Sequence, residues 1–145
     1  MSDLTNYSAA KLLLGMQQKT FSCVEVMQAY LKKINQINPT LNAIVQLADS
    51  DDLIKQAKIT DDLLARGKLI GKLQGVPMTI KDHIQVKDFL VTRGSLAFKN
   101  NRCIEDAPIV SKLKSAGAII LGTTNMPEGG PAFESDNDIY GQTRN

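Results

Sequence analysis

Leu73-Gln-Gly-Val-Pro-Met-Thr-Ile-Lys-Asp82 is the stretch that decides the fold. Gly75 interrupts the preceding segment, and Pro77 is typical of a strand entry, where a missing N–H group is tolerated. Alternating apolar residues, which would share one face of a sheet, follow from there: Val76, Met78 and Ile80. The pattern predicts a short buried strand that presents a charged pair, Lys81-Asp82, at its end.

A lysine directly after an apolar run has two interpretations. Lys81 is either a solvated charge at the end of a strand or a buried amine. The residues alone favour the first, because charged side chains are seldom buried. The second has a chemical use, since desolvation disfavours the ammonium form and a neutral lysine is a general base.

The composition is that of an ordinary globular chain. It has 145 residues, the size of one domain, with 43% hydrophobic and 22% charged residues. The 17 basic and 15 acidic residues are interspersed and leave a formal net charge of +2, which gives no electrostatic case for nucleic-acid binding. No apolar run reaches the roughly 20 residues of a membrane span, and the first residues do not resemble a signal peptide.

These features predict a cytoplasmic protein in which Cys23 and Cys103 are reduced thiols. His83 is the only histidine, so the sequence offers no Cys/His cluster for zinc. A lone histidine is most often a hydrogen-bonded structural residue. We expect no metal and no cofactor.

The first 70 residues are predicted to be mainly helical. Helices are expected from Ser8 to about residue 18, from the capping-box pair Ser22/Glu25 to Asn38-Pro39, and over 49–66 with Gly67 as its stop. A short apolar run at 43–47 predicts a strand. Apolar residues at helical spacing predict the buried faces: Ala9, Leu12, Leu13, Met16, Val24, Met27, Leu31, Ile34, Leu53, Ala57 and Leu64.

Residues 71–145 are predicted to be α/β. After a loop at 85–99, Asp106 is expected to cap a helix that Gly117 ends. Its expected buried face consists of Ile109, Val110, Leu113 and Ala116. The continuous apolar run 118–121 predicts a strand covered on both faces, with loop from Thr123 onward. Two convincing strands are too few for a closed sheet, so we expect an unfinished sheet whose edge favours self-association.

The chain is identified as a member of the amidase signature family from stretches that occur in the family's order and spacing. These are Leu73–Asp82, Thr92–Ser95, Asp106–Val110, Leu113, Ala116–Asn125 and Tyr140–Asn145. The resemblance runs from about Leu4 to the last residue. The family includes bacterial amidases, fatty-acid amide hydrolases and the A subunit of glutamyl-tRNA(Gln) amidotransferase.

The resemblance implies a large mixed sheet wrapped by helices and a Ser–Ser–Lys triad. The family's lysine corresponds to Lys81, which would take a proton from a bridging serine and so activate the nucleophilic serine. Asp82 would help to position Lys81 or simply form a turn. Both serines follow the last residues of this sequence in family members, so we expect residues 1–145 to be the N-terminal portion of an amidase signature domain that is inactive alone.

Gly129 and Gly130 are the candidate substrate-binding residues. In family members the loop that contains these two glycines borders the acyl pocket, where glycines would leave room for a small-molecule amide. Ordinary turn chemistry explains the two glycines equally well. Two functions remain open. The chain is part of an enzyme that hydrolyses carbon–nitrogen amide bonds, or it is a truncated non-catalytic relic or interaction module. These residues do not separate an amidase from part of an amidotransferase.

Overall fold

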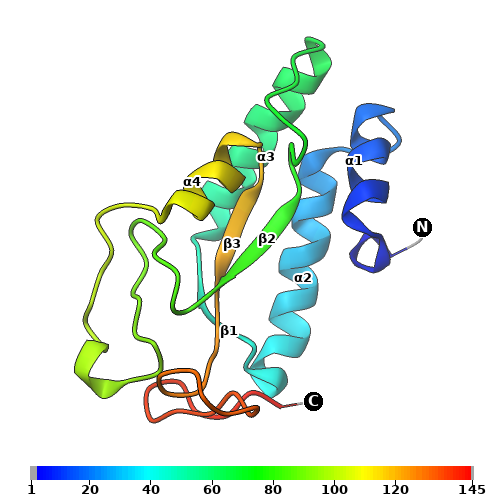
Figure 1. The fold of residues 1–145 in the computed structure, drawn as a ribbon. Coiled ribbons are helices and arrows are strands. Elements are labelled where there is room, and N and C mark those ends of the chain that lie inside the picture. The colour runs from blue at the N-terminus through cyan, green and yellow to red at the C-terminus, as the bar shows by residue number, and fades with distance from the viewer. Residues whose placement is uncertain (1–2, 145) are drawn as a thin grey trace. The chain divides into compact units, whose positions relative to one another are not determined.

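The computed structural model describes residues 3–144 (Figure 1). Within that range the helices are α1 (Ala9–Gln17), α2 (Cys23–Leu41), α3 (Ser50–Ala65) and α4 (Pro108–Ser115). The strands are β1 (Ile44–Leu47), β2 (Pro77–Lys81) and β3 (Ile119–Thr124), and two short 3-10 helices, η1 and η2, occupy Leu4–Asn6 and Leu96–Phe98. The chain is therefore α/β, as predicted.

The first two predicted helix starts are confirmed, because their capping bonds are present. The Ser8 hydroxyl accepts a hydrogen bond from the Lys11 N–H at 3.3 Å. The Ser22 N–H donates to Glu25 Oε2 at 2.7 Å, and the Glu25 N–H donates to Ser22 Oγ at 3.0 Å, which is the reciprocal capping box. These bonds satisfy N–H groups that a helix start leaves unpaired.

The predicted inner face of α1 is confirmed at Leu12 and Met16, whereas Leu13 is only half-buried. Leu12 and Met16 are buried and belong to the core, whereas Ala9 is exposed. Ala9 lies in the first turn, beside the exposed cap Ser8. The buried stripe therefore begins one turn later than the spacing predicts.

The predicted end of α2 is wrong. The helix continues through Pro39 to Leu41. A proline this close to a helix end removes one backbone hydrogen bond, but the last turn still closes, since the Asn42 N–H donates to the Asn38 carbonyl at 2.7 Å. The left-handed φ of +53° at Asn42 then ends the helix.

The helix α3 lies within the predicted range 49–66. Asp49 caps it by accepting from the N–H groups of Asp51 and Asp52. Gly67, with φ +69°, follows its last turn as expected. Its inward side chains Leu53 and Ala57 are fully buried, as the helical spacing predicts.

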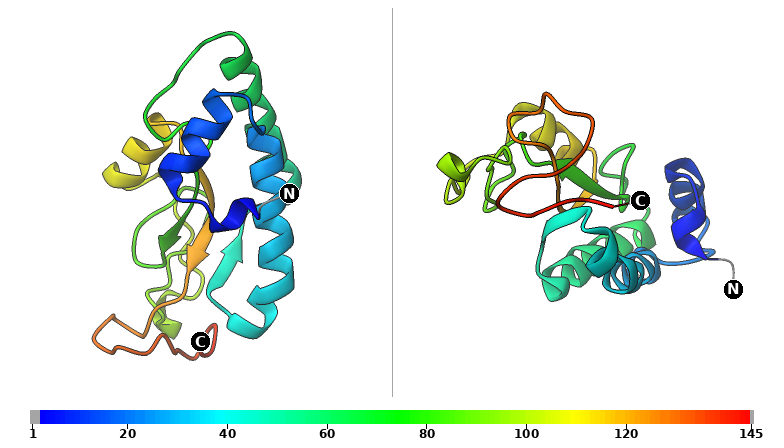
Figure 2. Two further views of the ribbon diagram at one scale, coloured as in Figure 1. Left: turned by 90° about the vertical axis from the view of Figure 1, so that its right-hand side faces the viewer. Right: turned by 90° about the horizontal axis from the view of Figure 1, so that it is seen from below.

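The sheet has the strand order β1-β3-β2, with β3 in the centre (Figure 1). The pairing of β1 with β3 is antiparallel, and the arrows of β2 and β3 point the same way in Figure 2, so the sheet is mixed. The strand β3 is buried along nearly its whole length, as predicted, but it extends to Thr124. The expectation of loop from Thr123 is wrong, because Gln46 and Leu47 pair with Thr123 and Gly122 and so continue the ladder.

The strand β2 is less buried than the alternation predicts. Ile80 is buried, Met78 is half-buried, and Thr79 and Lys81 on the alternate face are exposed. The strand lies at one edge of the three described strands, so one of its hydrogen-bonding edges has no strand partner among residues 3–144.

The helix α4 differs from its predicted face at one position. Val110 is fully buried, whereas Ile109 is 52% exposed. Leu113 lies three positions after Val110 and is half-buried. The inward stripe of this short helix passes through that pair and leaves Ile109 on the solvent side. Gly117, with φ +93°, follows the helix as predicted.

The chain divides into two compact units, which we describe separately. The first comprises residues 3–36, 48–78 and 113–121, and its core joins α1, α2, α3 and the start of β3. Figure 2 shows the three helices from two further directions. The fully buried core side chains include Leu12, Cys23, Val26, Met27, Leu53 and Ala57.

The second unit comprises residues 37–47, 79–112 and 122–144. Much of it is loop, including residues 125–144, which are orange to red in Figure 2. Asn125 holds this segment in place, because its Nδ2 donates to the Gly141 carbonyl at 2.8 Å and to Thr143 Oγ1 at 3.1 Å. Asn137 Nδ2 in turn donates to Asn125 Oδ1 at 2.7 Å.

Candidate functional site

Lys81 is the last residue of β2, and its side chain is exposed. The chain turns immediately afterwards, because the N–H groups of His83 and Ile84 both donate to the Lys81 carbonyl, at 2.8 and 3.0 Å. The Asp82 N–H donates to the Thr124 carbonyl at 3.0 Å and so fixes the end of the strand. The lysine side chain is thereby presented from a fixed point of the backbone.

Asp82 is fully buried and anchors a neighbouring loop. Its carboxylate accepts hydrogen bonds from the Thr92 N–H, at 3.1 Å, and from the Thr92 hydroxyl. Burial raises the pKa of Asp82, and the bonds from Thr92 act in the opposite direction. Among the described residues, the side-chain hydrogen bonds of Asp82 link it to this loop rather than to Lys81.

The anchored loop carries Arg93 in an uncommon backbone conformation. Arg93 has φ +54° and Gly94 has φ +68°. The Arg93 N–H donates to the Asp82 carbonyl at 3.1 Å, and the Arg93 carbonyl accepts from the Gly129 N–H at 2.9 Å. The Gly94 N–H donates to Thr92 Oγ1 at 3.1 Å. The backbone of Arg93 is thus held on both sides.

A cavity of about 440 Å³ within the second unit collects the residues predicted for the site. It is lined by Lys81, His83, Arg93, Met126, Gly129 and Gly130. Lys81 and the glycine pair are far apart in the sequence, and the fold brings all three to one cavity. The volume falls within the usual range of small-molecule sites.

The two glycines have a conformational role that is independent of any ligand. Gly129 has φ +66° and Gly130 has φ +87°. A Cβ atom on Gly130 would lie 3.4 Å from Met126 Cε, which is ordinary contact. The positive φ values therefore account for both glycines as turn residues, and their role in leaving room for substrate stays a prediction.

Sequence reasoning missed three residues that line the cavity: His83, Arg93 and Met126. His83, which the sequence favours as a structural residue, has an exposed side chain. The signal for Arg93 lies in the Thr92–Ser95 stretch, where a long basic residue precedes a glycine at a turn. Met126 lies in the loop that also contains Gly129 and Gly130, but its side chain was not itself singled out.

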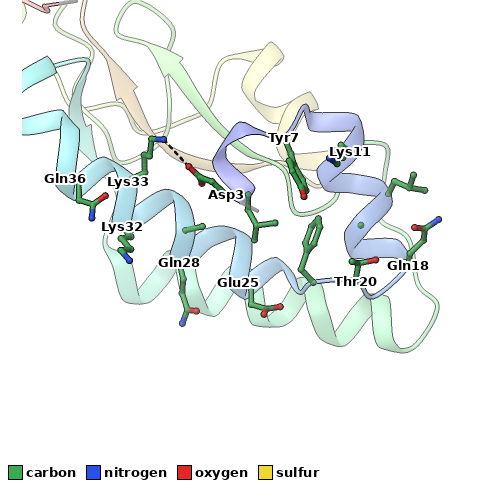
Figure 3. A pocket seen from close by; sticks show the side chains of 15 residues that line it. Asp3, Tyr7, Lys11, Gln18, Thr20, Glu25, Gln28, Lys32, Lys33 and Gln36 are labelled. Carbon is green, nitrogen blue, oxygen red and sulfur yellow. Dashed lines mark hydrogen bonds and ion pairs between the residues drawn. The ribbon is translucent and has the colours of Figure 1, made fainter. Parts of the chain in front are cut away.

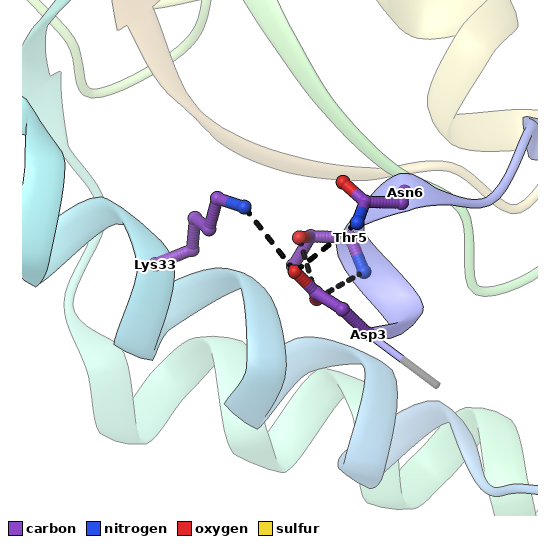
Figure 4. A network of polar contacts seen from close by, with 4 residues as sticks. All are labelled: Asp3, Thr5, Asn6 and Lys33. Carbon is purple, nitrogen blue, oxygen red and sulfur yellow. Dashed lines mark hydrogen bonds and ion pairs between the residues drawn. The ribbon is translucent and has the colours of Figure 1, made fainter. Parts of the chain in front are cut away.

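A larger cavity, of about 900 Å³, lies in the first unit between η1, α1 and α2 (Figure 3). Asp3 and Lys33 form an ion pair of 3.2 Å there, and the Asp3 carboxylate also accepts from Thr5 and Asn6 (Figure 4). Hydrogen bonding from Thr5 lowers the pKa of Asp3. This cavity contains none of the residues predicted for the site.

Other chemistry-bearing residues give no second candidate within residues 3–144. No group of three or more His, Cys, Asp and Glu side chains in that range could hold a metal ion. Cys23 and Cys103 are free thiols in buried positions, and burial raises the pKa of Cys23 to about 12. No helix in the same range has the length and apolar character required to cross a membrane.

Comparison with known proteins identifies relatives of this arrangement. The chain is 34% identical over 145 residues to the A subunit of the glutamyl-tRNA(Gln) amidotransferase of Thermobifida fusca, covering 100% of this chain and 29% of that protein. It is 36% identical over 139 residues to an indoleacetamide hydrolase of Bradyrhizobium diazoefficiens, covering 96% of this chain and 26% of that protein.

A solved structure shows the same fold. The peptide amidase of Stenotrophomonas maltophilia matches with a TM-score of 0.86 and 32% identity, over 97% of this chain and 30% of that one. The chain thus spans less than a third of the length of each of these proteins. The amidase family profile matches residues 25–145, and the chain therefore belongs to the amidase family.

Proposed function

We propose that this chain supplies the lysine of a Ser–Ser–Lys triad that hydrolyses the carbon–nitrogen bond of a small-molecule amide. Lys81 is the general base in this proposal. The two serines would come from polypeptide beyond residues 1–145, in line with the short share of its relatives that the chain covers. One relative is named as part of an amidotransferase and the other as an indoleacetamide hydrolase.

One observation carries the proposal. Lys81 lies at the end of β2 and lines the same cavity as Gly129 and Gly130, in a chain that belongs to the amidase family. A base is useful only where a substrate can reach it. Among residues 3–144 the side chain of Lys81 is exposed and so can be reached by a substrate. The desolvation that favours a neutral amine would have to come from the polypeptide that carries the serines.

The proposed reaction uses the unprotonated amine of Lys81. The amine accepts a proton from the bridging serine, which accepts one from the nucleophilic serine as that hydroxyl attacks the amide carbonyl. The amine of the substrate leaves with a proton, and water then hydrolyses the acyl-enzyme. Gly129 and Gly130 would leave space for the acyl group.

The test uses a polypeptide that extends through both serines. Lys81→Ala is expected to lower kcat/KM for amide hydrolysis by about 10²- to 10⁴-fold, the usual contribution of a positioned general base. Lys87→Ala, at an exposed lysine that does not line the cavity, is the matched control. Equal activity of the two variants would refute the role of Lys81.

A serine-reactive fluorophosphonate gives a second test. We expect stoichiometric labelling of the longer polypeptide and none of residues 1–145. Labelling of the shorter chain would mean that one of its own serines is activated. Self-association through the sheet edge and a cytoplasmic location also remain predictions.

A further inference from the structure

We propose that the guanidinium group of Arg93 binds a carboxylate of the substrate, so that the amide acted on at this site carries a negative charge. The inference rests on the proposed function, because it assigns a substrate class to the same cavity. It adds a binding residue, Arg93, that the sequence did not single out.

The charge of the cavity wall is one-sided. Among residues 3–144 its lining contains Lys81, His83 and Arg93 but no aspartate or glutamate. Lys81 is assigned to proton transfer, whereas an arginine is always charged and cannot serve as a base. The ion pairs found within residues 3–144 are Lys33–Asp3 and Lys55–Asp52, and neither involves the arginine. The permanent cation in the wall is therefore able to meet an anion.

Arg93 has a backbone conformation that glycine adopts more readily than other residues. A φ of +54° is uncommon for a residue with a long side chain and costs conformational free energy. Hydrogen bonds on both sides, to Asp82 and from Gly129, over-determine this conformation. The arginine is thus presented from a rigid point, which reduces the ordering needed when it binds a ligand.

A neighbouring ring leaves the polar edge of the guanidinium accessible. Arg93 Cζ lies 5.7 Å from the centre of the Phe98 ring. A ring attracts the cation by its face, while the N–H groups at the edge of the guanidinium remain able to donate two parallel hydrogen bonds to a carboxylate. Phe98 therefore supports Arg93 without competing for the ligand.

The size of the cavity is compatible with a small ligand. A volume of about 440 Å³ suits a small molecule. A compact amide with a second, ionised end fits both features: the amide near Lys81 and the carboxylate at Arg93. Monoamides of dicarboxylic acids and short N-acyl amino acids belong to this class.

The test compares succinamate, which has an amide and a carboxylate, with succinamide, its neutral near-isostere. Binding is measured by NMR titration of the polypeptide that extends through both serines, with Lys81→Ala in every sample so that hydrolysis does not consume the ligand. We expect succinamate to bind more tightly than succinamide, and Arg93→Gln to weaken succinamate binding about tenfold, as loss of a charged hydrogen-bond partner does. Lys87→Gln removes one positive charge outside the cavity and should change binding less than about twofold.

A second variant guards against misfolding. Arg93→Asn keeps a residue that tolerates the left-handed conformation and should reproduce the loss, while Arg93→Lys should restore part of the binding. Undetectable binding of succinamate, equal binding of the two ligands, or unchanged binding by Arg93→Gln and Arg93→Asn would overturn the inference. None of these outcomes bears on the role of Lys81, which the hydrolysis comparison of Lys81→Ala tests separately.

Discussion

Replacement of Asp82 by alanine tests whether the buried carboxylate holds the Arg93 loop. The side chain is fully buried and accepts from both the N–H and the hydroxyl of Thr92. Alanine leaves two buried donors without a partner, at about 1–3 kcal/mol each. Removal of a buried charge returns part of that loss. We therefore expect a net loss of about 2–3 kcal/mol in the free energy of unfolding.

The assay is urea unfolding followed by circular dichroism, together with amide hydrogen exchange at Thr92 and Gly94. Asp136→Ala is the matched control, because Asp136 is an exposed aspartate of the same unit. It should change stability by less than about 0.5 kcal/mol. If Asp82→Ala matches the control in stability and in exchange at Thr92, the carboxylate does not anchor the loop.

The pH dependence supplies a signature that a packing defect would lack. Burial raises the pKa of Asp82 above its ordinary value of 3.8, so the folded chain binds this proton more tightly than the unfolded chain. The stability contributed by its proton binding is present below that value and is lost as the pH rises through the raised pKa. The difference in stability between the native chain and Asp82→Asn should follow this course, and a difference constant with pH would contradict it.

Three further predictions test packing and caps. Gly122→Ala should lower the free energy of unfolding by about 3 kcal/mol, since its Cβ would overlap the Gln46 carbonyl oxygen. A free energy of unfolding within about 0.5 kcal/mol of the native value would contradict the close approach of the Gly122 and Gln46 backbones. Asp61 accepts hydrogen bonds from the first N–H groups of α2, starting with Cys23 at 2.7 Å. Asp61→Ala should therefore lower the free energy of unfolding in urea by about 1–2 kcal/mol, whereas the control Asp62→Ala, at an exposed position, should change it little. Cys23, fully buried and with its pKa raised to about 12, should resist iodoacetamide until the chain unfolds, and fast alkylation of the native chain would refute its burial.

The elements that could be predicted from the sequence are those whose signals are local. Ser8 and the Ser22/Glu25 pair satisfy N–H groups within one turn of their own position, so the sequence contains both partners. The alternation in β2 is local in the same sense. The extension of β3 to Thr124 escapes such rules because 77 positions separate Gln46 from Thr123, and no local pattern contains their pairing.

The residues of the candidate site also divide into those that could be predicted from the sequence and those that could not. Lys81 and the two glycines are predictable through resemblance to a family, and the fold brings them to one cavity. Arg93 is not, because its place depends on long-range bonds to Asp82 and Gly129. A positive φ at an arginine has no signature in the residue itself, so only the structure reveals it.

The register of β2 explains how adjacent residues serve opposite purposes. Side chains alternate between the two faces of a strand, so Lys81 shares the face of Thr79. Asp82 is the first residue of the turn after β2 and is buried, as Ile80 is. Ile80 and Asp82 are buried, whereas Thr79 and Lys81 are exposed. A shift of one residue would bury the lysine and expose the aspartate, which would remove the base from the cavity and release the Arg93 loop together. Because one strand register fixes both, the position of Lys81 and the anchoring of Arg93 cannot vary independently in this fold.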